Sequence, residues 1–188
     1  FSECKNIENI YIPSTLSSID NHAFYSSTGL KEIHISNIAA WCSFGLDGSN
    51  TPLRYAKLYY NGELLTDLVI PEGVTEIKQY SFYNQNNIKT VTIPSTVKTI
   101  GQYAFSGCNG CTELTIPGNV EIIGNYAFNG CIGITNLTLL EGIKNIGEYA
   151  FQNCTGLTEV NIPDSVEIIG YGAFENCDGL TTVSLPAN

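Results

Sequence analysis

The chain has 188 residues, of which 43% are hydrophobic and 14% are charged, and its formal net charge is −10. This composition allows a substantial buried core and leaves much of the solubility to Ser, Thr, Asn and Gly, because charged residues make up about 25% of a typical globular domain. The acidic surface argues against binding to nucleic acids or anionic membranes, and no apolar stretch is long enough to span a bilayer.

The first predicted element is a repeat with a period of 23 residues. One copy contains Ile12-Pro13 and Ala23-Phe24, and Ile35 follows Ile12 by one period. Phe1 and Cys4 match the end of a preceding copy. The terminal repeats of such arrays normally carry polar caps, which this chain lacks, so we expect the parent protein to continue beyond at least one end.

Residues 36–64 depart from the repeat. The step from Ile35 to Ile70 is 35 residues, which is one period plus an insertion of 12. Asn61-Gly62 lies between apolar segments and predicts a two-residue β-hairpin, because both positions accept a positive φ. The segment also contains Trp41 and Arg54, the single tryptophan and the single arginine. It is either a recognition loop with exposed aromatic side chains or an irregular coil that Trp41 fills from inside.

From residue 65 onward the repeat is regular, and each copy predicts the same elements. In the best-preserved copy, residues 160–162 alternate between apolar and polar, as in a half-buried strand that Pro163 ends. Residues 165–169 predict a second extended segment, and Gly170 predicts a turn with positive φ. Residues 173–177 predict one helical or 3₁₀ turn. The copies are marked by phenylalanines at Phe82, Phe105, Phe128, Phe151 and Phe174.

One copy of this repeat cannot fold alone. Its roughly eight inward side chains stabilise it by roughly 1.5–3 kcal/mol each, whereas ordering 23 backbone units costs roughly 1–2 kcal/mol apiece. Stacked copies cover each other's open faces and add ladder hydrogen bonds at a spacing of about 4.8 Å. We therefore expect residues 1–188 to form a single array that is truncated at both ends.

The cysteines follow the same period. Cys108-x-x-Cys111 imitates a redox or metal motif, but Cys111 occupies the position that Leu30, Ile88 and Leu157 fill in other copies, so it is expected in the core. Stacked coils point their Cβ atoms in parallel, which opposes the torsion of a disulfide. We expect buried free thiols that pack as small hydrophobic groups. The in-register cysteines are Cys4, Cys108, Cys131, Cys154 and Cys177.

Tyrosines make another column, directly before the Ala-Phe or Ser-Phe pairs. They either form an exposed stripe that could stack against sugar rings, or cover the edges of adjacent coils with their hydroxyls in water. The column consists of Tyr80, Tyr103, Tyr126 and Tyr149.

The exposed face of the predicted main sheet follows from the alternation along each strand. Two outward columns result, rich in hydroxyl and amide groups and mildly acidic, with Glu32 and Asp67 as expected neighbours. They form either a polar platform for a protein or glycan, or a plain solvated face. The candidate binding residues are Glu32, His34, Asp67, Thr92, Glu113, Thr115, Asn136, Thr138, Glu159 and Asn161, with Trp41 from the insertion.

The repeated pattern Leu-x-x-Val-x-Ile-Pro, Val-x-x-Ile-Gly and Ala-Phe-x-x-Cys resembles the BspA-like leucine-rich repeats and extends over essentially the whole chain. The resemblance implies an α/β-type leucine-rich-repeat solenoid, a right-handed horseshoe-like stack of mainly parallel strands with short 3₁₀ or helical turns. It also implies a cell-surface or secreted location and adhesion to host or microbial partners. Two departures from the pattern are Gln85 in place of Cys and Leu140 in place of Pro.

The functional hypothesis is a domain that binds a macromolecule through its sheet face, without enzymatic activity and without a cofactor or metal. The chain has only two histidines, His22 and His34, and no recognisable catalytic motif. The expected partner is a host or microbial surface protein, or a glycan. The alternatives are a structural spacer of a larger surface protein and a carbohydrate-binding module.

Overall fold

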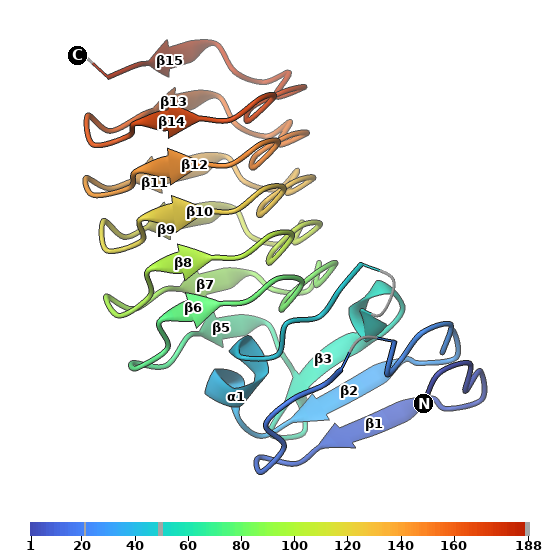
Figure 1. Cartoon of the computed structure of the whole chain (residues 1–188). Coiled ribbons are helices and arrows are strands. Elements are labelled where there is room, and N and C mark those ends of the chain that lie inside the picture. The colour runs from blue at the N-terminus through green and yellow to red at the C-terminus, as the bar shows by residue number, and fades with distance from the viewer. Residues whose placement is uncertain (21, 49–50, 187–188) are drawn as a thin grey trace.

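The computed structural model describes residues 1–20, 22–48 and 51–186, and it is a stack of coils in which each turn of the chain lies on the one before (Figure 1). The strands are parallel apart from one hairpin. This confirms the predicted leucine-rich-repeat solenoid. The outward side of the longer strands is called the main face below, and the short strands lie on the return side.

The N-terminal block, residues 1–64, forms one sheet in the order β1-β2-β3-β4, with β4 antiparallel. Its helix α1 begins after Asn37, whose side chain accepts a hydrogen bond from the N–H of Ala40 at 3.0 Å. No helix in the described part of the chain is long and apolar enough to cross a membrane. The elements are β1 (Asn9–Ile12), β2 (Glu32–Ile35), α1 (Ile38–Cys42), the 3₁₀ turn η1 (Pro52–Arg54), β3 (Lys57–Tyr60) and β4 (Glu63–Leu64).

The C-terminal block, residues 65–186, carries strands on both sides of each coil. The return-side strands form a continuous ladder in the order β14-β12-β10-β8-β6, whereas the main-face strands are hydrogen-bonded in pairs, β5-β7, β9-β11 and β13-β15. Main-face strands are β5 (Asp67–Val69), β7 (Thr90–Thr92), β9 (Glu113–Ile116), β11 (Asn136–Leu139), β13 (Glu159–Asn161) and β15 (Thr182–Ser184). Return-side strands are β6 (Glu76–Ile77), β8 (Thr99–Ile100), β10 (Ile122–Ile123), β12 (Asn145–Ile146) and β14 (Ile168–Ile169).

The stack bends between the two blocks, and β1 to β3 are tilted against the coils that follow (Figure 1). The cause is the hairpin at Asn61-Gly62, whose φ angles are 51° and 89°. It returns β4 along the edge of β3, with Tyr59 opposite Leu64. Because the antiparallel β4 pairs with β3, the next parallel sheet starts anew at β5.

The insertion corrects one expectation about the main face. Residues 36–48 and 51–60 belong to a coil of their own, and β3 pairs in parallel with β2 so that Lys57 lies opposite Glu32. Glu32 and Asp67 are therefore not neighbours, and that prediction was wrong. The hairpin itself is present as expected.

The turns of the coils also differ from expectation. The residue before each Ala-Phe or Ser-Phe pair has a positive φ, for example 56° at Tyr103 and 58° at Tyr126. The segment itself forms consecutive turns closed by i→i+3 hydrogen bonds, the 3₁₀ pattern that was expected. Gly170 does not have a positive φ. It belongs to a glycine column needed for close packing: a Cβ atom at Gly147 would lie 2.7 Å from the backbone N of Asn125 in the preceding coil.

Aromatic and thiol ladders fill the core of the C-terminal block. The rings of successive phenylalanines are stacked, with centroids 5.2 Å apart between Phe105 and Phe128 and again between Phe128 and Phe151. The thiol of Cys131 donates to the carbonyl of Phe105 at 3.1 Å. Burial raises the pKa of Cys131 to about 12. All seven cysteines are free, and all except Cys4 are buried, which confirms the expected core thiols.

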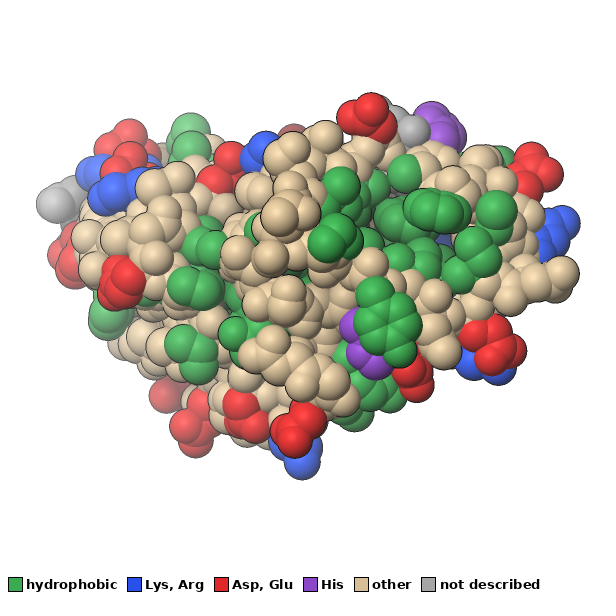
Figure 2. Space-filling model, turned by 90° about the horizontal axis from the view of Figure 1, so that it is seen from below, with side chains coloured by type: hydrophobic (Ala, Val, Ile, Leu, Met, Phe, Trp, Pro, Cys, Tyr) green, Lys and Arg blue, Asp and Glu red, His purple; other side chains and the backbone are tan. Residues whose placement is uncertain are grey.

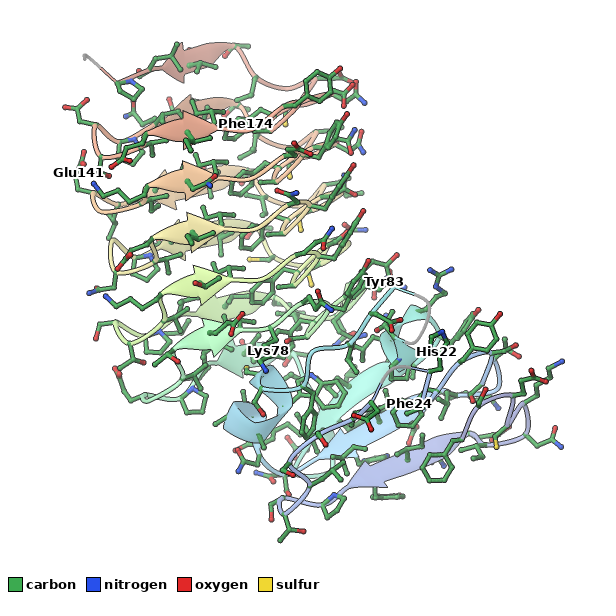
Figure 3. The ribbon with its side chains drawn as sticks, in the orientation of Figure 1. His22, Phe24, Lys78, Tyr83, Glu141 and Phe174 are labelled. Carbon is green, nitrogen blue, oxygen red and sulfur yellow. The ribbon has the colours of Figure 1, made fainter. Side chains whose placement is uncertain are left out.

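Buried polar contacts join the two blocks. The indole N–H of Trp41 donates to the carbonyl of Ser81 at 2.6 Å. The N–H of Lys78, which Figure 3 shows beside α1, donates to the carbonyl of Cys42, the last residue of that helix. Gln85, fully buried, accepts a hydrogen bond from the N–H of Leu58 at 2.8 Å and donates to the carbonyl of Ala56 at 3.0 Å. Gln85 stands where the other coils of the C-terminal block have Cys, so this departure from the repeat completes the backbone hydrogen bonding of the insertion.

Candidate functional site on the main face

The main face of the C-terminal block is polar and fully accessible. Its strands are only three or four residues long, so each coil exposes two side chains, and every one of these side chains is exposed. The structure thus places eight of the candidate binding residues side by side on one surface. They are Asp67, Thr92, Glu113, Thr115, Asn136, Thr138, Glu159 and Asn161.

Carboxylates and neutral side chains alternate along this face. Each hydrogen-bonded strand pair has its acid on the first strand, because Asp67 lies opposite Thr90, Glu113 opposite Asn136 and Glu159 opposite Thr182. The arrangement therefore repeats every two coils. Neighbouring strands lie about 4.8 Å apart, so successive carboxylates are roughly 10 Å apart along the stack.

The acid at the N-terminal end of this row is the best anchored. The hydroxyls of Thr90 and Thr66 each donate to the carboxylate of Asp67 at 2.8 Å. These two hydrogen bonds hold the pKa of Asp67 below its usual value, because they stabilise the charged form. Asp67 therefore presents a fixed negative charge.

The main face of the N-terminal block is different, because it carries stacked rings. The His34 ring lies between Tyr11 at 4.4 Å and Tyr59 at 4.8 Å, measured between centroids. Glu32 accepts a hydrogen bond from Nε2 of His34 at 2.9 Å. Burial, followed by the charge and hydrogen bond of Glu32, raises the pKa of Tyr59. In the view from below, which looks at this end of the stack, hydrophobic side chains partly cover a histidine (Figure 2).

Two features of this aromatic cluster were missed from the sequence. Lys57 and Tyr59 lie on the main face next to Glu32 and His34. The segment Lys57-Leu-Tyr-Tyr60 alternates between outward and inward side chains as β2 does, but it was assigned only to the hairpin. Trp41 is the opposite case: only 1% of it is exposed, so its prediction as a binding residue was wrong. It packs edge-on against Phe44 and fills the irregular coil.

The tyrosine column covers the coils. Its rings stack face to face, with centroids 4.6 Å apart between Tyr103 and Tyr126 and 4.8 Å apart between Tyr80 and Tyr103. Burial raises the pKa of Tyr80 to about 12. Because the ring faces contact each other, they are not free to stack on a sugar, which favours the covering role.

Within residues 1–20, 22–48 and 51–186, no group of three or more His, Cys, Asp or Glu side chains is placed to hold a metal ion.

Solved structures of similar proteins share this architecture. A leucine-rich cell surface protein of Faecalibacterium prausnitzii A2-165 is 25% identical, with 96% of this chain and 61% of that chain covered and a TM-score of 0.51. The T. pallidum leucine-rich-repeat protein is 22% identical, with coverages of 92% and 77% and a TM-score of 0.60. The pneumococcal vaccine antigen PcpA is 20% identical, with coverages of 95% and 50% and a TM-score of 0.65. This chain thus spans less than two thirds of the first and last of these proteins.

A comparison with curated proteins found no match. A comparison with family models matched the one described as BspA type leucine-rich repeat region, in six copies over residues 1–44 and 55–181. These residues include every regular coil and exclude only the irregular part of the insertion and the C-terminal residues. The chain belongs to the BspA-type leucine-rich-repeat family.

Proposed function

We propose that this chain is the binding domain of a surface-displayed or secreted adhesion protein, and that its main face binds a protein partner with basic groups. The observation that carries the proposal is the row of exposed carboxylates on Asp67, Glu113 and Glu159. No Lys or Arg lies among the outward side chains of β5, β7, β9, β11, β13 and β15. Lys89, exposed directly before β7, lies close enough for its charge to lower the pKa of Asp67, but the outward strand side chains themselves carry only negative charge. Such a row attracts and orients a partner of the opposite sign.

The spacing of the row favours a repeating partner. Carboxylates roughly 10 Å apart match basic side chains seven residues apart on one face of a helix, or basic side chains on every second strand of a partner sheet. Thr and Asn between the acids add hydrogen-bond donors and acceptors without competing charge. The shallow hollow beside Glu159, lined also by Asn161, Thr182 and Ser184, offers such groups together.

The aromatic cluster of the N-terminal block supplies a second contact region. Tyr11 is 72% exposed and its ring is held against His34. Exposed tyrosines that are already ordered lose little entropy on binding and are enriched among the residues that dominate interface energy. The cluster and the acidic row belong to the same sheet side of one stack and are separated by the bend.

The surface location rests on the relatives. One similar structure is described as a cell surface protein and another as a vaccine antigen. Both are longer than this chain, which covers 61% and 50% of them.

The test is binding of the purified domain to a panel of immobilised extracellular-matrix proteins. A variant with Asp67→Lys, Glu113→Lys and Glu159→Lys should bind at least tenfold more weakly. A control with Glu72→Lys, Glu76→Lys and Glu148→Lys has the same change in net charge on other exposed positions and should bind like the original chain.

Equal losses in both variants would show that only net charge matters and would contradict a site on the main face. Binding to none of the proteins would favour the spacer, and binding only to glycans would favour the carbohydrate-binding module. Far-ultraviolet circular dichroism checks that both variants remain folded.

A further inference from the structure

Two adjoining hollows lie where the first two coils meet the insertion, at the N-terminal ends of β2 and β3. The smaller one, of about 240 Å³, is lined by Tyr25, Ser26, Thr51, Arg54 and Tyr55 among others. The larger and shallower one shares Arg54 and Tyr55 and adds Lys5 and Lys31. Together they form what is called the Arg54 recess below. It belongs to the turn side of the N-terminal block, where Figure 3 labels Phe24, another lining residue, and not to the main face.

Arg54 is held in place by its own turn. It is the last residue of η1, and the two residues before it, Pro52 and Leu53, are buried. One guanidinium nitrogen, Nη2, donates to the carbonyl of Gly48 at 3.1 Å. No ion pair joins Arg54 to an acid among the described residues. The guanidinium therefore retains donors in the fork geometry that suits a carboxylate.

The charge around the recess is opposite to that of the chain. Lys5, Lys31 and Arg54 line the larger hollow, and Glu8 is the single acid there, paired with Lys31 at 2.5 Å. Among the residues that line the larger hollow, two positive charges remain in excess, in a chain whose net charge is −10. Asp47, directly before the lining residue Gly48, is a further acid close by. A local field of this sign concentrates anions at the recess.

The remaining lining suits a sugar ring. Tyr25 and Tyr55 are 43% and 50% exposed, so their rings offer apolar surface to C–H groups. Ser26 adds a hydroxyl. Thr51 is only 5% exposed, and its hydroxyl has no hydrogen-bond partner in the described structure. A buried hydroxyl without a partner is costly, so a ligand oxygen that reaches it is favoured.

We infer that the Arg54 recess binds an acidic saccharide, with the carboxylate of one sugar unit on Arg54 and the pyranose ring between Tyr25 and Tyr55. The smaller hollow lies just below the range of about 300–1,000 Å³ that is typical of sites for drug-sized molecules, so it accommodates a single unit. An acidic peptide would pair with the cations but would leave the aromatic rings and hydroxyl groups of the recess without a binding partner. The site is independent of protein binding at the main face.

The experiment is isothermal titration calorimetry of the 188-residue chain with 3′-sialyllactose, a disaccharide ending in glucuronate, and lactose. At least one acidic sugar should bind at least tenfold more tightly than lactose, and the pair of acidic sugars identifies the source of the carboxylate. Arg54→Gln should weaken that binding at least tenfold, and Tyr55→Leu should weaken it as well. Lys144→Gln, which removes an exposed cation paired with Glu167 on the return side, should leave it unchanged.

Several results would overturn the assignment: no binding of either acidic sugar at millimolar concentration, equal binding of lactose, or undiminished binding by Arg54→Gln. Binding of a Glu-rich peptide in place of the sugars would overturn it too. The main-face variant with Asp67→Lys, Glu113→Lys and Glu159→Lys should still bind the sugar, and a loss there would move the site elsewhere. The fluorescence of Trp41 verifies that each variant keeps its fold.

Discussion

The contact between the two blocks depends on Gln85, and replacing it by leucine tests this directly. Leucine has a similar volume, so no large cavity forms, but the N–H of Leu58 and the carbonyl of Ala56 lose their partner. Each buried polar group left unsatisfied costs about 1–3 kcal/mol, so Gln85→Leu should lower the free energy of unfolding by about 2–6 kcal/mol. With a urea m value of about 2 kcal/mol/M, the midpoint falls by about 1–3 M.

The assay follows urea unfolding with two probes. Trp41 is the single tryptophan and its indole N–H donates across the same junction, so its emission reports on the contact between the blocks. Far-ultraviolet circular dichroism reports on all coils. In Gln85→Leu the emission should shift to longer wavelength before the dichroism is lost. Gln102→Leu, at an exposed position, is the control and should stay within about 0.5 kcal/mol.

For a second substitution at position 85, the structure and the consensus of the repeat predict stability changes of opposite sign. Gln85→Cys restores the residue of the other coils of the C-terminal block, and such consensus changes commonly stabilise by about 0.5–2 kcal/mol. The structure predicts a loss of stability instead, because the Cys side chain is too short to reach the N–H of Leu58 or the carbonyl of Ala56 and leaves a void. A Gln85→Cys variant that is as stable as the original chain, or more stable, would refute the role of Gln85.

Three further predictions concern the coils. Gly147→Ala should lower the free energy of unfolding by about 3 kcal/mol in thermal unfolding, because the new Cβ lies 2.7 Å from a backbone atom. Gly130→Ala, where φ is 70° and the space around the residue is open, should cost about 1–2 kcal/mol. A reversed order would contradict the packing role of the glycine column. Burial raises the pKa of the Cys42 and Cys131 thiols to about 12. Both thiols should therefore react with a disulfide reagent at pH 8 only after unfolding, while the half-buried Cys4 reacts first. Fast labelling of Cys131 in the native protein would be inconsistent with this prediction. Tyr80, whose pKa is raised from 10.0 to about 12 in the folded state, should ionise near pH 12 in an absorbance titration at 295 nm. Its contribution to stability is therefore complete below pH 10 and is lost as the pH rises through 12. Titration of all tyrosines near pH 10 would argue against the stacked column.

The structure of the regular coils was predictable because it follows from patterns that are visible within each copy of the repeat. Alternation along the chain is enough to assign the outward side chains of β9 and β13, and the period of 23 residues is enough to stack Phe105 on Phe82. These features recur in every copy, so each one supports the others. The same logic identified Cys111 as a core residue.

The insertion was less predictable because it follows no repeat. The place of β3 depends on the N–H of Lys57 bonding to the carbonyl of Lys31, a contact that no local pattern signals. Gln85 was visible as a departure, but its partners lie 27 and 29 residues away along the chain. Arg54 was noted as the only arginine, and Tyr25 and Thr51 meet it only in the folded chain.

The turn geometry was mispredicted for a physical reason. A positive φ is usually assigned to Gly or Asn, since other residues meet steric strain there. At Tyr103 the strain is offset by a hydrogen bond from its N–H to the carbonyl of Asn125 and by ring stacking on both neighbours. Tertiary contacts between coils therefore decide a dihedral angle that looks local.

The two-coil pattern of acids affects how proteins of this kind can change length. Duplicating two adjacent coils of the C-terminal block, for instance the pair that carries Glu113 and Asn136, lengthens the molecule and keeps charged and neutral strands in alternation. Duplicating a single coil sets two carboxylates, or two neutral residues, on adjacent strands about 4.8 Å apart. Recombination between similar repeats would thus change the charge spacing of the surface in one step while keeping an apolar residue at each core position of the coil.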